Sequence, residues 1–211
     1  MLLNESKSKV MIFNYTNNYQ FGTRIYLNNT LLDTITETKL LGTIISSDLT
    51  WHKNSEMLIK KGYQRMTLLR KLYEFDVPKD DLVIIYTLYI RSILEYNSNV
   101  WFSNITEEER EDLERVQRVA CKIILKGNYI SYELALAELN LQTLSERRLM
   151  LAERFAKKCV KSEQFNDLFP KNGNQNLNLR NTEKYNVKFA STGRLMTSSI
   201  PAMQRLLNQA L

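Results

Sequence analysis

Apolar and polar positions follow two different periods along the chain, and the change comes near residue 50. Before that point, short apolar runs are separated by polar turns, a pattern typical of β-strands. Asn28 and Asn29 separate two of these runs in the manner of a hairpin turn. Gly42 marks a bend or a close backbone approach within the last run. The predicted strands cover residues 9–15, 24–27, 31–35 and 40–45.

Residues 51–75 have the period of an α-helix instead. At about 100° per residue, apolar side chains gather on one side of this helix. They are Leu58, Ile59, Gly62, Met66, Leu69 and Tyr73. The opposite side, which we call the lysine face, consists of Lys53, Lys60, Gln64, Thr67 and Lys71. The segment carries six basic and two acidic side chains, so we expect one side to pack and the lysine face to be able to lie along phosphates.

The next helix is expected to be the central buried helix of the protein. Pro78 is placed as a first-turn proline, and Asp80 and Asp81 follow it where the helix dipole favours acidic residues. The helix is apolar on most sides. Its main face is predicted to contain Leu82, Ile85, Tyr86, Tyr89, Ile90 and Ile93. Residues 97–103 interrupt the helical pattern.

Capping signals predict the remaining helices. Thr106 with Glu109 and Thr143 with Glu146 match the capping-box spacing, and they predict helices that end near residues 127 and 161. A shorter helix is expected over residues 132–139. The predicted apolar stripes are Leu113, Val116, Ala120, Ile123 and Ile124 in the first helix, and Leu144, Leu151, Phe155 and Cys159 in the last.

The whole pattern predicts an α+β fold in which short N-terminal strands, including a hairpin, precede a predominantly α-helical bundle. The β segment is expected over residues 1–50 and the bundle over residues 51–169. Residues 170–211 are expected to hold an Asn-rich loop, a strand over residues 185–189 and a short amphipathic helix from Ser199.

Composition limits the classes of protein that the chain can belong to. A chain of 211 residues with 44% hydrophobic content can bury a core, and a pI of about 9.2 permits a polyanionic partner. Two cysteines are too few for a disulfide framework or a zinc cluster. The apolar run of residues 82–90 is too short to span a bilayer, and no signal peptide opens the chain. We therefore expect an intracellular protein, cytoplasmic or nuclear, without a membrane partner.

Three stretches, taken in order, resemble reverse transcriptases of non-LTR retrotransposons. Residues 3–11 (LNESKSKVM) resemble the stretch that follows the catalytic hairpin of the palm subdomain. Residues 40–51 (LLGTIISSDLTW) resemble the strand and turn that end the palm. Parts of residues 89–101 and residues 113–117 (LERVQ) resemble the thumb helices. Each match is short. The three matches occur in the same order as in the family, and this shared order makes the resemblance specific.

The resemblance implies that the chain is a fragment of an RNA-directed DNA polymerase from a transposable element. Residues 1–50 would form the distal edge of the palm and residues 51–169 the thumb. The parent polymerase would use Mg ions held by palm carboxylates, including the pair of an [F/Y]xDD hairpin. The chain lacks such a hairpin, so we expect no catalysis by this chain alone, no cofactor of its own, and a need for the upstream palm and fingers.

In that family the thumb follows the primer–template duplex. The resemblance therefore makes the lysine face a candidate surface for an RNA–DNA or RNA template–primer duplex, because phosphate contacts require cations at fixed spacing. Lys61 and Arg65 lie nearer the packing boundary of the same helix and are secondary candidates. Without the resemblance, the solvated side of an amphipathic helix is the simpler interpretation.

Other residues have weaker functional interpretations. Lys7 or Lys9 matches a lysine that in the family sits near the incoming nucleotide, so both are candidate general acids. Trp51 and Trp101 are candidates for stacking on bases, although packing is the expected role of an indole at such amphipathic positions. His52 is expected to be exposed.

Two alternatives remain open. Residues 60–101 also resemble the AlkB-homologue N-terminal domain, which is associated with tRNA-modifying oxygenases and methyltransferases. Such an oxygenase needs two histidine ligands, whereas the chain has one histidine. A methyltransferase would need a glycine-rich turn, whereas the six glycines are scattered singly. The other alternative is a non-catalytic α+β interaction module without a nucleic-acid role.

Overall fold

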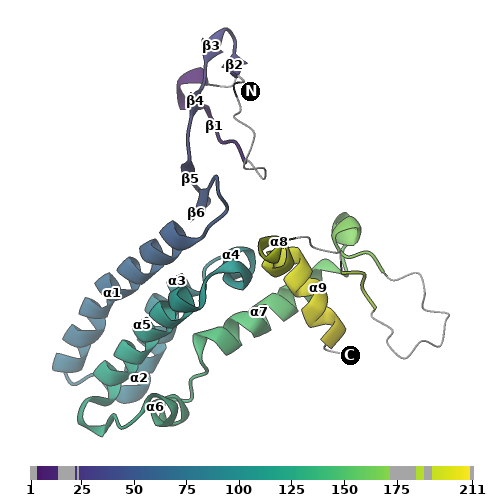
Figure 1. Cartoon of the computed structure of the whole chain (residues 1–211). Helices are drawn as coiled ribbons and strands as arrows, with labels where there is room; N and C mark the ends of the chain where they lie inside the picture. Colours follow the sequence, from purple (N-terminus) through teal and green to yellow (C-terminus); the bar gives the residue numbers. More distant parts are fainter. Residues whose placement is uncertain (1–3, 14–21, 23, 172–183, 188–191, 210–211) are drawn as a thin grey trace, which may run out of the picture. The chain divides into compact units, whose positions relative to one another are not determined.

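The structure, a computed structural model, describes residues 4–13, 22, 24–171, 184–187 and 192–209 (Figure 1). It divides into two compact units, Met1–Glu56 and Met57–Leu211. Short strands come first and helices follow, so the chain is an α+β protein, as the sequence predicts. Helix α1 (His52–Glu74) begins in the first unit and continues into the second.

The strands of the first unit pair two by two within the described residues. The pairs are β1 (Lys9–Val10) parallel to β4 (Asp33–Thr34), β2 (Tyr26–Leu27) antiparallel to β3 (Thr30–Leu31), and β5 (Glu37–Leu40) antiparallel to β6 (Thr43–Ser46). A 3₁₀ turn, η1 (Glu5–Lys7), precedes them. The buried side chain of Asn54 accepts a hydrogen bond from the Ile44 amide at 3.2 Å and so ties β6 to the start of α1.

The predicted β2–β3 hairpin is confirmed, whereas the single strand predicted over residues 40–45 is wrong. Asn28 and Asn29 have φ values of 47° and 67°, which fit a type I′ turn. Leu41 and Gly42 also have positive φ values, 46° and 89°, and they form the turn between β5 and β6. Gly42 is thus at the bend that the sequence indicated, but leucine rarely adopts this conformation, so a full reversal of the chain at Leu41 was not predicted. Of the strand predicted over residues 9–15, β1 is observed, and residues 14–15 lie outside the described part.

Helices make up the second unit. After α1 they are α2 (Lys79–Ile85), α3 (Ser92–Leu94), α4 (Ser98–Trp101), α5 (Glu107–Leu125), α6 (Tyr132–Glu138), α7 (Leu144–Cys159), α8 (Gly193–Thr197) and α9 (Ser199–Gln209). A π-helical turn, η2 (Tyr86–Arg91), joins α2 to α3. The 3₁₀ turns are η3 (Phe102–Asn104), η4 (Lys126–Asn128) and η5 (Glu163–Leu168). Both predicted capping boxes are present, at Thr106 and Thr143.

The helix predicted to be central is buried on one side and exposed on the other. Leu82, Tyr86 and Ile90 are buried along one row. Leu88 and Tyr89, however, are 73% and 42% exposed, so the prediction that Tyr89 belongs to the buried face is wrong. Tyr89 lies within the π-helical turn, where the wider helical period moves it off the face that a regular 3.6-residue period assigns to it.

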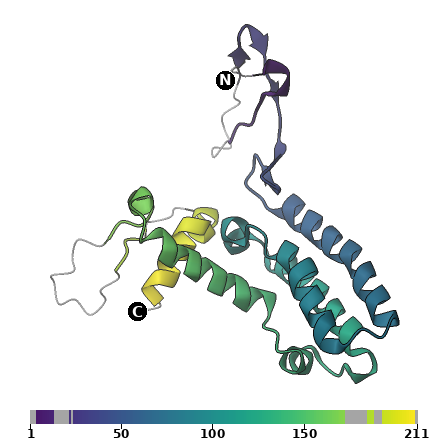
Figure 2. The ribbon, with the colours of Figure 1, turned by 180° about the vertical axis from the view of Figure 1, so that it is seen from behind.

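Helix α1 lies against α5 in the second unit, and both views of the ribbon agree on this (Figures 1 and 2). Gly62 is at the point of close approach. A Cβ at this position would lie 2.8 Å from Cγ1 of Val116 and 3.3 Å from Cδ2 of Leu94. The glycine is therefore required by packing, in agreement with its place on the predicted apolar side.

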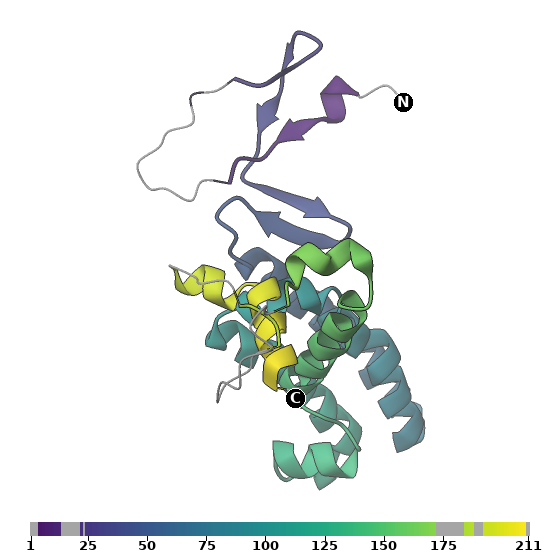
Figure 3. The same cartoon turned by 90° about the vertical axis from the view of Figure 1, so that its right-hand side faces the viewer.

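The C-terminal helix packs on α7 (Figure 3). Their shared core contains Ala156, Cys159, Phe169, Tyr185, Met203 and Leu207. The predicted helix from Ser199 is confirmed as α9. Of the strand predicted over residues 185–189, the described residues show a single bridge between Tyr185 and Lys171. The predicted loop over residues 171–180 lies outside the described part except for its first residue.

Candidate nucleic-acid interface

The two sides of α1 differ in exposure as the sequence predicts. Leu58, Met66 and Leu69 are buried. All five residues of the lysine face are exposed. Lys53 belongs to the first unit, and the four residues from Lys60 onward belong to the second. The orientation of the face is confirmed, and its role in binding remains a prediction.

Lys60 and Lys71 have carboxylates on the same side of α1 but, within the described part of the chain, form no ion pair with them. Among the described residues, no carboxylate lies within ion-pair distance of Lys60 or Lys71. Glu56 and Glu74 lie toward the two ends of the same side of the helix. Glu56 is already 3.1 Å from Nε2 of His52, which is exposed as predicted. The positive charge of the face comes from its lysines, and the exposed residues between Lys60 and Lys71, Gln64 and Thr67, are neutral.

The secondary candidates lie at the edge of the lysine face. Lys61 and Arg65 are half-buried. The guanidinium of Arg65 lies 4.2 Å from the centre of the Tyr89 ring, and its Nη1 donates a hydrogen bond to the carbonyl of Tyr89. Arg65 thus connects α1 with η2 and is less available to a phosphate than Lys60.

The two candidate general acids lie in the first unit. Lys7 ends the turn η1, and Lys9 opens β1. Both side chains are exposed. The residues expected on the lysine face from Lys60 onward belong to the other unit, so the two groups of lysines are separate features of the chain.

Trp101 is a core residue and has no face available to a base. Its side chain is fully buried, and its Nε1 donates a hydrogen bond to the carbonyl of Tyr96 at 2.9 Å. The Phe102 ring meets it edge-on, with ring centres 6.4 Å apart. Trp51, just before α1, is half-buried. Packing is thus the observed role of Trp101, in agreement with the expectation from sequence.

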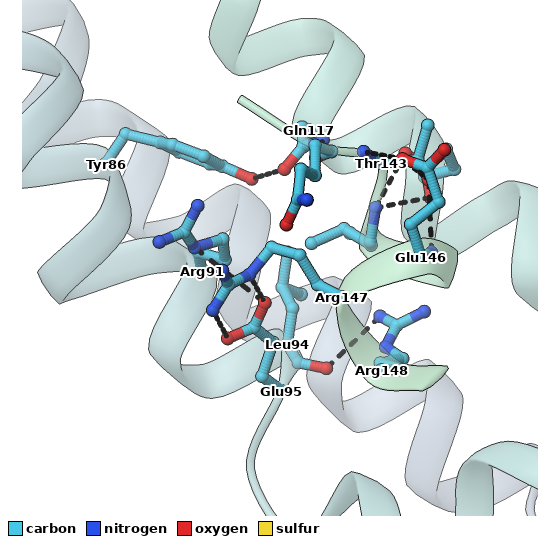
Figure 4. Close-up of polar contacts among 12 residues, drawn as sticks. Tyr86, Arg91, Leu94, Glu95, Gln117, Thr143, Glu146, Arg147 and Arg148 are labelled. Carbon is cyan, nitrogen blue, oxygen red and sulfur yellow. Dashed lines mark hydrogen bonds and ion pairs between the residues drawn. The ribbon is translucent and has the colours of Figure 1, made fainter. Parts of the chain in front are cut away.

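A polar network lies between η2, α3, α5 and α7, and sequence reasoning missed it (Figure 4). It is half-buried at Glu95 and Arg147 and fully buried at Gln117. Glu95 receives two bonds from Arg147, 2.5 Å from Nε and 3.1 Å from Nη2. Nε of Arg91 lies 3.8 Å from the same carboxylate. The bonds to Glu95 raise the pKa of Arg147, while burial lowers the pKa of Arg91. The bidentate pair joins the end of α3 to the start of α7.

Gln117 is the centre of the second part of this network. Its Oε1 accepts a hydrogen bond from the Tyr86 hydroxyl at 2.6 Å. Its Nε2 donates to the Tyr132 hydroxyl at 2.8 Å and to the Gln142 carbonyl at 2.9 Å. Burial raises the pKa of Tyr86 well above its ordinary value, so this phenol remains a neutral donor. Every polar atom of the fully buried Gln117 amide group thus has a partner, as a buried amide requires.

Glu114 binds the N-terminal end of α7. Both of its carboxylate oxygens lie 3.1 Å from the amide nitrogen of Leu144, and the Tyr132 hydroxyl donates to Oε1. A carboxylate at a helix N-terminus is stabilised by the helix dipole. Burial, followed by the bond to Glu114, raises the pKa of Tyr132. The phenol is consequently protonated at neutral pH and can donate this bond.

Arg148 is fully buried among aromatic rings. Its Nη2 donates to the carbonyl of Leu94 at 3.2 Å. Its guanidinium carbon lies 5.3 Å from the centre of Trp101 and 5.2 Å from that of Phe102. Burial lowers its pKa to about 10, so it is charged at neutral pH. The sequence did hold a signal for the burial of Arg148, because this residue lies four positions after Leu144 on the predicted apolar stripe of α7. Phe155, which was predicted to lie on that stripe, is exposed.

The network connects η2, α3, α5, α6 and α7 through hydrogen bonds and an ion pair. Its carboxylates are occupied by arginine, amide and phenol donors. Among the described residues, no group of three or more His, Cys, Asp or Glu side chains is placed to hold a metal ion.

None of the described helices combines the length and the apolarity needed to cross a membrane. Comparison of the chain with protein-family models, curated proteins and solved structures returns no match.

Proposed function

We propose that this chain binds the sugar–phosphate backbone of an RNA–DNA or RNA template–primer duplex through the lysine face of α1. In this proposal it is a non-catalytic remnant of a retrotransposon RNA-directed DNA polymerase, and it acts in the cytoplasm or nucleus, where such duplexes form. The observation that carries the proposal is the exposed row from Lys60 to Lys71 on a helix whose other side is fixed in the core.

The geometry of the row suits a backbone contact. Lys60 and Lys71 are about 16 Å apart along the helix axis, which corresponds to several nucleotide steps. Gln64 and Thr67 lie between them and are exposed, and neutral side chains of this kind also donate to phosphate oxygens. Burial of Met66 and Leu69 behind the row holds the helix in place, so binding would cost little ordering of the backbone.

The β5–β6 hairpin supports the same proposal from the first unit. In the family that the chain resembles, this strand and turn help to hold the primer end. Leu41 is 82% exposed at the tip of the hairpin and has a φ of 46°. An exposed leucine in a left-handed conformation is costly, and such strain is often retained where a ligand is contacted.

The test is a salt titration of binding to a short, fluorescently labelled RNA–DNA hybrid, followed by anisotropy. We expect binding at low salt, with an affinity that falls steeply as salt rises because counterions are released. Lys60→Glu combined with Lys71→Glu should abolish binding. Lys158→Glu combined with Lys161→Glu is the matched control, since it changes the net charge equally at exposed lysines elsewhere.

Two results would contradict the proposal. Equal loss of affinity in both double variants would show that net charge alone governs binding. Undetectable binding of the parent protein at low salt would instead favour the α+β interaction module. That second candidate is favoured by one observation, the exposure of the paired residues Tyr26 and Leu31 on β2 and β3, because adjacent exposed apolar residues mark protein contacts.

A further inference from the structure

A cavity of about 220 Å³ lies in the second unit, where several segments of the chain meet. Its walls are formed by α4 with η3, the start of α5, the middle of α7, and α9. Figures 1 and 2 both place α9 beside α7. Ser199 Oγ donates a hydrogen bond to the carbonyl of Val100 at 2.5 Å, and Thr197 Oγ1 donates to Oδ1 of Asn104 at 2.6 Å. These bonds connect α8 and α9 with α4 and η3, so the walls of the cavity are held together.

Much of the lining of this cavity is apolar. Phe102 and Met203 are buried, and Leu206 is half-buried. Leu149 and Gln209 also line the cavity and are exposed, so a ligand can enter from water beside them. A cavity of about 150 Å³ holds a benzene molecule, whereas pockets for drug-sized ligands begin at about 300 Å³. The cavity therefore has room for one aromatic ring with a short substituent.

The charged side chains of the described lining are both arginines. Arg110 comes from α5 and Arg205 from α9. Nη2 of Arg110 donates a hydrogen bond to the carbonyl of Phe102 at 3.2 Å, and its guanidinium lies 4.5 Å from the centre of the Phe102 ring. Nη2 of Arg205 donates to the carbonyl of Met196. Because a guanidinium carries several N–H donors, these bonds hold each group in place and leave other donors for an anion.

The surroundings of Phe102 carry a second positive charge. The guanidinium carbon of the buried Arg148 lies 5.2 Å from the centre of the same ring. Burial is the main cause that lowers the pKa of Arg148, and the charge of Arg110 lowers it further. Glu107 lies 3.7 Å from Nε of Arg110, but its side chain is 92% exposed, so water screens this pair. An anion beside Arg110 would offset the repulsion between the two guanidinium groups.

Two polar side chains of the lining have unused hydrogen-bonding capacity. Oγ of Ser103 and Oδ1 of Asn99 are buried and have no hydrogen-bond partner among the described residues. Buried polar atoms of this kind are uncommon in folded proteins, and a bound water or ion is a frequent explanation. The Ser103 hydroxyl can rotate to donate to a ligand carboxylate, and Asn99 can accept from a ligand hydroxyl or from water.

We propose that this cavity binds a small organic anion that consists of one aromatic ring and a carboxylate. The guanidinium groups of Arg110 and Arg205 supply charge-assisted hydrogen bonds to the carboxylate. The ring packs against Phe102 and Met203, because aromatic rings and the methionine sulfur both attract an aromatic partner. None of these residues belongs to the lysine face, so the site is independent of the proposed duplex binding.

The experiment uses phenylacetate as the probe and isothermal titration calorimetry as the measurement. We expect a dissociation constant of about 1 mM or lower, which is reasonable for a ligand of this size. Acetate lacks the ring and phenylethanol lacks the charge, so each should bind at least about tenfold more weakly. Arg110→Gln combined with Arg205→Gln should weaken phenylacetate binding by about tenfold or more. Arg70→Gln combined with Arg154→Gln is the matched control, since it removes two exposed arginines elsewhere.

Nuclear magnetic resonance of isotope-labelled methionine methyl groups locates the ligand in the parent protein, whatever the stability of the variants. Phenylacetate should shift the signal of Met203, which lines the cavity, and leave that of Met66 in the core beneath α1 unchanged. An unchanged Met203 signal at about 10 mM phenylacetate overturns the proposal, since such weak binding has no specificity. Equal affinity for acetate or phenylethanol, or equal loss in both double variants, also overturns it. Salt-dependent duplex binding through the lysine face is unaffected by any of these results.

Discussion

Arg148 places a charged guanidinium inside the helical unit with a carbonyl, and no carboxylate, as its hydrogen-bond partner among the described residues. Nε and Nη1 of this side chain have no hydrogen-bond partner there. Its charge is balanced at longer range by Glu95 and Glu114 and by the faces of two aromatic rings. Desolvation of such a group costs about as much as its interactions return.

Substitution of Arg148 tests that balance. Arg148→Met removes the buried charge and keeps most of the volume, so we expect the free energy of unfolding to change by less than about 1 kcal/mol. Arg148→Ala leaves a cavity beside Trp101 and should cost about 3 kcal/mol. Urea denaturation measures both values. If the methionine variant loses as much as the alanine variant, the charge itself is stabilising.

The thiol of Cys121 gives a prediction for pH dependence. Burial raises its pKa to about 12, whereas a thiol in the unfolded chain has a pKa of about 8.5. The folded state thus disfavours the thiolate, and its contribution to stability is present below about pH 8.5 and is lost as pH rises toward 12. Ellman's reagent at about pH 8 should leave Cys121 unmodified until denaturant is added. Rapid modification in the native protein would contradict this.

At the scale of the elements, the interface of α1 with α5 depends on Gly62. Alanine there would gain about 1 kcal/mol in helix propensity. Its Cβ would, however, lie 2.8 Å from Cγ1 of Val116, and a β-branched side chain has little freedom to move away. We expect Gly62→Ala to lower the free energy of unfolding by up to about 2 kcal/mol net, since overpacking costs about 1–3 kcal/mol.

Gly127→Ala is the control for that experiment, because nothing lies within 4 Å of a Cβ built at this glycine. Its free energy of unfolding should stay within about 0.5 kcal/mol of the parent value. A double-mutant cycle of Gly62→Ala with Val116→Ala should show a coupling energy that is absent between Gly127→Ala and Val116→Ala. Equal effects of the two glycine substitutions would contradict the packing argument.

The sequence predicted elements wherever the determining signal was local. The Asn28–Asn29 turn and the two capping boxes are specified by side chains within four residues of one another, and all of them form. At the β5–β6 turn the bend at Gly42 was indicated, but the reversal of the chain was missed because Leu41 adopts a backbone conformation that leucine disfavours. The π-helical turn was missed because its supporting bond from Arg65 comes from another helix.

The polar network was beyond sequence reasoning for a similar reason. Glu95 and Arg147 are 52 positions apart, and Tyr86 and Gln117 are 31 apart. The hydrophobic periodicity of a segment carries no information about contacts between residues that are so far apart in the sequence. The lysine face, in contrast, follows from the helical period alone, and its exposure was predicted correctly residue by residue. Binding depends on the ligand as well as on the surface, so the role of the lysine face in binding stays a prediction.

For the whole molecule, the two units should differ in local stability. The first unit holds two-stranded sheets of two to four residues per strand, and isolated two-stranded sheets are marginal in water. The second unit buries many apolar side chains, among them Leu113, Val116 and Ile124 of α5. We expect amides of β5 and β6 to exchange with deuterium at least about a hundredfold faster than those of buried α5. Mass spectrometry after short exchange times measures this, and equal protection would contradict it.

The placement of the two tryptophans makes each unit optically distinct. Trp51 belongs to the first unit and is partly accessible to water, whereas Trp101 is sealed in the second beside the guanidinium of Arg148. The fluorescence of Trp101 should have a shorter emission wavelength than that of Trp51 and should resist quenching by iodide. The fluorescence of Trp51 should be quenched by iodide. A Trp51→Phe variant would therefore report on the helical unit alone, and the difference from the parent spectrum would report on the strands, without any added label.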